Sequence, residues 1–128
     1  MKRYVVPVVV LFALMSTHIG SAQLPNLNEL MRQKLEHGQN LLAAIVQGDH
    51  VSVERYANEL TLLSEASTWT SLRTPEYLQY ASWFRDASRQ LVEEAQDRNT
   101  ERMTFAYTEL ITTCVQCHRH VRGAQQAD

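Results

Sequence analysis

The 128-residue chain has little cysteine, and this scarcity excludes several kinds of site. A structural zinc site uses four Cys or His ligands, commonly from two separated pairs. The chain offers only Cys114 and Cys117, and His120 is too close to His118 to form a second half. A thioredoxin-like redox pair would need a βαβ setting, and no strand pattern is present. A disulfide between the two cysteines stays open, because an oxidising compartment would allow it.

The chain also lacks an apolar run long enough to cross a bilayer. Its longest, Val5 to Met15, contains Pro7 and stops at Ser16. That falls short of the roughly 20 residues that a transmembrane helix requires. The mature chain is therefore expected to have no membrane span.

The residues that flank this apolar run are typical of a secretory signal peptide. A short basic start precedes it, and the small residues Gly20, Ser21 and Ala22 follow it. We predict a cleaved signal peptide over residues 1–22 and a single domain over residues 23–128, which is long enough for one hydrophobic core. The mature protein is then expected to be periplasmic or otherwise extracytoplasmic.

Positive charge is not in excess. The formal charge is -2, and removal of residues 1–22 leaves 10 basic against 14 acidic side chains, a charge of -4. A nucleic-acid-binding protein would need a basic face, so no nucleic acid is expected as a partner. The chain also has no internal repeat and no low-complexity segment.

Apolar residues instead recur at intervals of three and four, which is the helical period. The first helix is expected to begin at Asn26 or Asn28, either of which could cap it, and to end at Gly48. Asp49 can cap a second helix, which is expected to fade between Ser64 and Ser67.

An irregular connection should follow, up to Thr74. There, Thr as cap and Pro75 at the first helical position predict a third helix, ending near Asp97. A fourth can open at Thr100 and Glu101, and its apolar side extends at least to Val121. Short connections and the lack of strands predict an all-α, antiparallel up-down-up-down four-helix bundle.

Residues 114–118 read Cys-Val-Gln-Cys-His, the spacing of a c-type haem attachment sequence. Each thiol can add across one haem vinyl group, and the imidazole can coordinate the iron. Because residues three and four apart share a helix face, Cys114, Cys117 and His118 can address one macrocycle. The sequence predicts one covalent haem c near the C-terminus. In bacteria this attachment takes place outside the cytoplasm, in agreement with the predicted signal peptide.

The chain resembles the cytochrome c prime family and its low-spin relatives, four-helix monohaem cytochromes with haem attached near the C-terminus. The family motif CxxCHxxxR continues here to Arg122. Pro75-Glu76 followed by Phe84, and Trp69 before them, also resemble family features. The matches span Leu27 to Arg122. One departure is Tyr77-Leu78, because the family usually has an aromatic after Pro-Glu-x.

The resemblance implies two alternatives for the iron position opposite His118. A Met there gives a six-coordinate electron carrier, and Met31 is the first candidate. An apolar residue leaves the iron able to bind a gas, and Leu35 is then expected at that position. His37 is a weaker candidate for ligation, and Lys34 a weaker one still, since an ammonium does not bind iron.

Two arginines are candidates for contacts with the haem group. Arg32 could pair with a propionate, and Arg122 could lie close to the His118 imidazole and tune its basicity. For both, a solvated surface charge is an equally weighted alternative.

Three functions follow from these observations. The first is an extracytoplasmic electron-transfer cytochrome with a redox protein as partner, and the second is a five-coordinate cytochrome that binds nitric oxide or carbon monoxide. The third is a haem-free helical module with a disulfide. No enzyme is expected, because the chain offers no nucleophile–base pair, and Glu93 and Glu94 are adjacent on a helix and point apart. The resemblance also suggests a homodimer.

Overall fold

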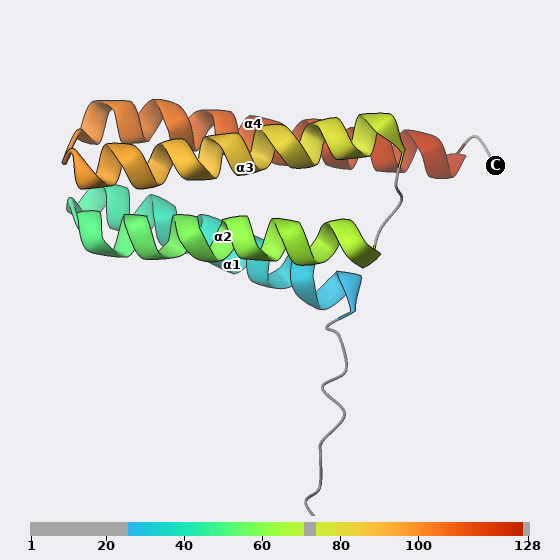
Figure 1. Ribbon diagram of the computed structural model, residues 1–128, viewed down its shortest axis with the longest axis horizontal. Helices are drawn as coiled ribbons and strands as arrows, with labels where there is room; N and C mark the ends of the chain where they lie inside the picture. Colours follow the sequence, from blue (N-terminus) through green and yellow to red (C-terminus); the bar gives the residue numbers. More distant parts are fainter. Residues whose placement is uncertain (1–25, 71–73, 127–128) are drawn as a thin grey trace, which may run out of the picture.

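The computed structural model describes residues 26–70 and 74–126, which fold into four helices without any strand in these two ranges (Figure 1). They are α1 (Leu27–Gln47), α2 (His50–Thr70), α3 (Pro75–Gln96) and α4 (Thr100–Gln126). The predicted all-α bundle of four helices is confirmed. The predicted signal peptide over residues 1–22 lies outside the described residues. None of the helices described is both long and apolar enough to pass through a membrane.

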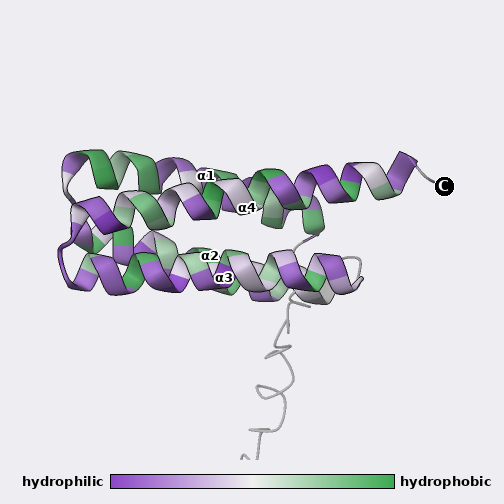
Figure 2. Ribbon diagram, turned by 90° about the horizontal axis from the view of Figure 1, so that it is seen from above, coloured by the Kyte–Doolittle hydropathy of each residue, from purple (hydrophilic) through white to green (hydrophobic). Residues whose placement is uncertain are grey.

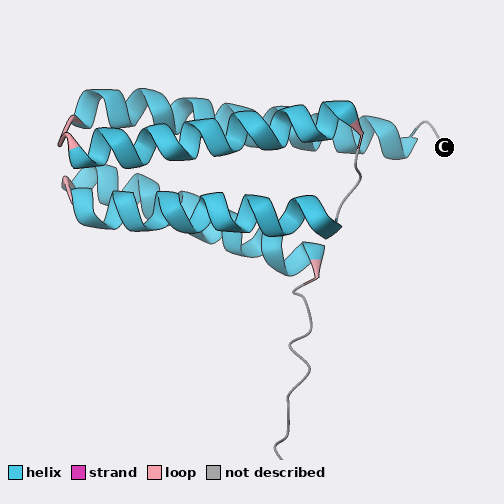
Figure 3. Ribbon diagram, in the orientation of Figure 1, coloured by secondary structure: helices cyan, strands magenta, loops and turns pink. Residues whose placement is uncertain are grey.

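The helices lie side by side along one long axis, joined by short loops where the connections are described (Figure 3). The α1–α2 and α3–α4 connections share one end of the bundle, and the C-terminal part of α4 reaches past the other end (Figure 1). Neighbours along the chain pack extensively, whereas α1 and α4 contact each other least. The seam between α1 and α4 is therefore the most open part of the bundle.

The predicted ends of the first and third helices agree with the structure. Asn26 caps α1 by accepting a 2.9 Å hydrogen bond from the backbone N–H of Glu29. Gly48 ends α1 in the left-handed conformation, φ 69°, where a residue without Cβ is unstrained. Thr74 caps α3 by accepting a 3.2 Å bond from the Tyr77 N–H. These local signals hold because capping depends on near neighbours in sequence.

The predicted end of the second helix was wrong. Instead of fading between Ser64 and Ser67, α2 continues to Thr70 and includes Trp69. The Ser67 hydroxyl donates to the Ser64 carbonyl at 3.0 Å, and the Thr68 hydroxyl donates to the same carbonyl at 2.8 Å. Ser64 and Ser67 are fully buried. Burial against the other helices thus overrides their low helix propensity, because their hydroxyls bond inside the helix.

The core is a layer of small and aliphatic side chains between the helices. Hydrophilic and hydrophobic residues alternate along every helix (Figure 2). Several large apolar side chains that recur with the helical period are nevertheless exposed, among them Leu35, Leu42, Val51, Leu62, Phe105 and Ile111. A helix in a bundle buries only a narrow stripe of its surface. The apolar residues with helical period therefore cover a wider face than the one that packs against the other helices.

Candidate functional site

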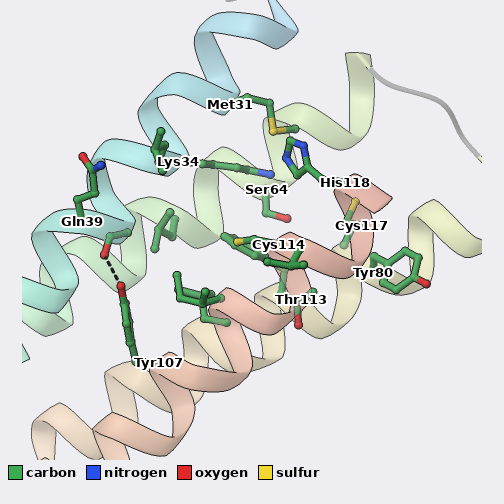
Figure 4. Close-up of a pocket in the computed structure, with 18 of the residues that line it drawn as sticks. Met31, Lys34, Gln39, Ser64, Tyr80, Tyr107, Thr113, Cys114, Cys117 and His118 are labelled. Carbon is green, nitrogen blue, oxygen red and sulfur yellow. Dashed lines mark hydrogen bonds between the residues drawn. The ribbon is translucent and has the colours of Figure 1, made fainter. Parts of the chain in front are cut away.

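A cavity of about 340 Å³ is lined by residues from all four helices (Figure 4). Its α2 and α3 walls are formed mostly by apolar and aromatic side chains, namely Leu60, Tyr77, Ala81 and Phe84, with Ser64 and Tyr80. The volume falls in the range of about 300–1,000 Å³ typical of small-molecule and cofactor sites. The cavity is the space that remains where α1 and α4 pack least closely.

The α4 wall carries the complete attachment motif. Cys114, Cys117 and His118 all line the cavity, as expected for residues three and four apart on one helix. Both cysteines are half-buried free thiols, so the structure contains no disulfide between them. Burial raises the pKa of both thiols, against a smaller lowering by Lys34. They are therefore neutral near pH 7, unlike the thiolates of redox-active or zinc-binding cysteines.

The α1 wall carries both residues that were predicted to lie across the iron from His118. Met31 and Leu35, one turn apart, both line the cavity. The Met31 thioether and the His118 ring lie next to each other in the view of Figure 4. His37 does not line the cavity. Its Nδ1 lies 3.1 Å from Glu59 Oε2, and its ring packs on Tyr56, with the ring centroids 5.7 Å apart.

Lys34 places an amine inside this mostly apolar space. Its Nζ donates to Ser67 Oγ at 2.8 Å and lies 4.9 Å from the centroid of the Phe84 ring. Burial lowers the pKa of Lys34 to about 8. At pH 7 the charged form still predominates, because the pH lies below that pKa. Sequence reasoning judged Lys34 only as an iron ligand and missed it as a buried charge.

Two further groups were missed. The Tyr107 hydroxyl donates to the Gly38 carbonyl at 3.1 Å and so joins α4 to α1 across the open seam. The Ser64 hydroxyl is fully buried at the cavity wall and has no protein hydrogen-bond partner. The signal for Lys34 was present, since Met31, Lys34, Leu35 and Gly38 share one helix face. Nothing local in the sequence indicated Tyr107 or Ser64.

The two predicted arginines are not brought into the cavity. Arg32 is exposed and pairs with Glu29 at 2.6 Å and with Glu36 at 3.6 Å. Arg122 is exposed on the last turns of α4 and does not line the cavity. Their contacts with haem propionates or with the His118 imidazole stay predictions.

Two of the residues that line the cavity, His118 and Met31, carry donor atoms that a haem iron can take. Within residues 26–70 and 74–126, no group of three or more His, Cys, Asp or Glu side chains is arranged to hold a metal. His118 is one nitrogen donor and Met31 one sulfur donor, which suits the two axial positions of an iron whose other four ligands come from a porphyrin. Comparisons of the chain with protein-family models, curated proteins and solved structures found no match.

Proposed function

We propose that this chain is a monohaem c-type cytochrome of the low-spin cytochrome c prime type, which carries electrons outside the cytoplasm. One observation supports the proposal above all others. The two cysteines and the histidine of the attachment motif, on α4, line the same mostly apolar cavity as Met31, which belongs to α1. Cytochrome c prime has the antiparallel up-down-up-down topology that we propose here.

In this proposal each residue of the motif has a separate task. Cys114 and Cys117 would hold the macrocycle through two thioether bonds, and His118 would supply one axial ligand. The neutral state of both thiols does not oppose such bonds, because each thiol proton is used when the sulfur adds to a vinyl group. Haem, when bound, supplies an iron that alternates between the ferrous and ferric states.

Met31, which lines the cavity from α1, would be the second side chain to hold the iron. A thioether ligand favours the ferrous state and raises the reduction potential relative to two histidines. If His118 and Met31 both held the iron, no position would be left for a substrate, and the group would supply electron transfer alone. Tyr77, Phe84 and Leu110 are buried at the cavity wall and would exclude water from the macrocycle.

A gas-binding cytochrome is the second candidate, supported by the position of Leu35. This side chain lines the cavity one turn beyond Met31. If the Met31 sulfur does not bind the iron, an apolar side chain is available to border an open coordination position. Nitric oxide or carbon monoxide would then be the ligand.

The absorption spectrum of the protein, expressed with its signal peptide in a strain that matures c-type cytochromes, tests both candidates. We expect a mass increase equal to one haem and sharp low-spin α and β bands. A broad high-spin spectrum would favour the gas-binding alternative, and a colourless protein of bare chain mass would refute both.

The sixth ligand is tested by a matched pair of variants. Met31→Ala should convert the low-spin spectrum to a high-spin one, whereas Leu35→Ala, in the same wall of the cavity, should leave it low-spin. An unchanged low-spin spectrum in Met31→Ala would eliminate Met31 as the ligand.

A further inference from the structure

Lysine is used at a single position in the predicted mature chain. Residues 23–128 contain nine arginines but only one lysine, Lys34. This lysine lines the cavity, whereas no arginine within residues 26–70 and 74–126 does. Arg85 lies outside the cavity wall but close enough to Lys34 to lower the pKa of its amine slightly. Lysine and arginine are not interchangeable, because an ammonium is a compact point charge on a flexible stem.

No acidic side chain in the described cavity wall neutralises this charge. None of the lining residues is Asp or Glu. The ammonium is instead held by a neutral hydroxyl, Ser67 Oγ at 2.8 Å, and by the face of the Phe84 ring. Both contacts favour a cation without cancelling its charge. The fully buried Ser64 hydroxyl adds only a neutral dipole to the same wall.

A cation that no carboxylate of the cavity wall neutralises has a definite electrostatic effect on a nearby redox centre. Oxidation of a ferrous haem adds one positive charge, and two positive charges repel more strongly in a poorly polarisable interior than in water. The ferrous state is therefore favoured. Exposed arginines have little such effect, because solvent and salt screen them.

We propose that Lys34 sets the reduction potential of this cytochrome by fixing a positive charge at the haem-binding cavity. This inference rests on the proposed haem attachment and adds a determinant distinct from the Met31 ligand. Lys34 acts through its charge and its position against Ser67 and Phe84, and it is not a ligand of the iron.

Midpoint potentials measured by spectroelectrochemical titration test the proposal on the haem-loaded protein. Lys34→Gln removes the charge but keeps a polar side chain that can reach Ser67. We expect the ferrous-to-ferric ratio at a fixed electrode potential to fall about tenfold, a decrease of about 59 mV for one electron. Lys34→Arg keeps the charge, so its midpoint potential should lie close to that of the unmodified protein.

Arg98→Gln is the matched control. Arg98 is exposed in the α3–α4 connection, at the end of the bundle away from the C-terminal part of α4 (Figure 1), and its loss changes the net charge by the same amount. The midpoint potential of the Arg98→Gln variant should equal that of the unmodified protein. A Lys34→Leu variant provides a second neutral replacement if Lys34→Gln folds poorly.

Three results would overturn the proposal. The first is a Lys34→Gln potential equal to or above that of the unmodified protein. The second is an equal shift in Arg98→Gln, which would mean that net charge alone matters. The third is a changed absorption spectrum in both Lys34→Gln and Lys34→Leu, which would identify the amine as an iron ligand. A protein without a Soret band would instead refute the proposed haem attachment.

Discussion

Removing the buried charge at Lys34 should change how the stability of the protein depends on pH. In the folded chain burial lowers the pKa of this amine from 10.5 to about 8. Between these two values the unfolded chain binds the proton and the folded chain has lost it. The free energy of unfolding therefore rises as the pH increases from about 8 to 10.5. Below about pH 8 the folded protein bears the full cost of burying the charged amine.

The size of the effect follows from the two pKa values. A difference of one pKa unit corresponds to about 1.4 kcal/mol, so the shift at Lys34 from 10.5 to about 8 represents about 3 kcal/mol between neutral and strongly alkaline pH. When Cys114 and Cys117 ionise at alkaline pH, their thiolates raise the pKa of Lys34 and so oppose the lowering by burial. Two thioethers could not ionise, so haem attachment would remove that opposition.

Urea denaturation of the unmodified protein and of Lys34→Met, at several pH values from about 7 to 10.5, measures this difference. We expect the variant to be the more stable of the two at pH 7, by about 3 kcal/mol at most, and the gap to close as the pH rises. Lys34→Met is suited to this assay because its unbranched apolar side chain fills the same space. Parallel pH profiles for the two proteins would refute the idea that Lys34 is a buried charge.

Three further predictions concern the core, the open seam and the lysine. Leu41→Ala should lower the free energy of unfolding by about 2–5 kcal/mol, because Leu41 is fully buried, whereas Val46→Ala, which is 78% exposed, should change it little in the same denaturation assay. Tyr107→Phe should cost about 0.5–1.5 kcal/mol, since it removes only the hydrogen bond to the Gly38 carbonyl; a loss above about 3 kcal/mol would show that the ring has moved. Lys34 should resist acylation by an amine-reactive reagent in the folded protein and react in urea, as followed by peptide mass spectrometry, and equal rates in both states would contradict its burial.

The helices could be predicted from local signals in the sequence. The prediction failed where contacts between distant parts of the chain determine the structure. The caps at Asn26 and Thr74 and the stop at Gly48 could be predicted, because each depends on residues a few positions away. The end of α2 could not, since Ser64 and Ser67 are helical only through their burial and their own hydroxyl bonds.

The same distinction applies to the cavity. That Cys114, Cys117 and His118 share one face followed from their spacing, and Met31 of α1 lines the same cavity, whereas its role as an iron ligand stays a prediction. The charge of Lys34 in the cavity and the Tyr107 contact with α1 depend on how the two hairpins pack, which spacing does not determine. The direction of His37 toward Glu59 is a similar consequence of packing.

The weak contact between α1 and α4 has a mechanical consequence for the bundle. In that seam the Tyr107 hydroxyl joins the two helices through one hydrogen bond. A flat cofactor bound beside it would keep α1 and α4 apart and would also supply apolar contacts that hold them together. Without the cofactor, amide protons of α1 near Gly38 should exchange with solvent sooner than those of α3, which is packed between α2 and α4.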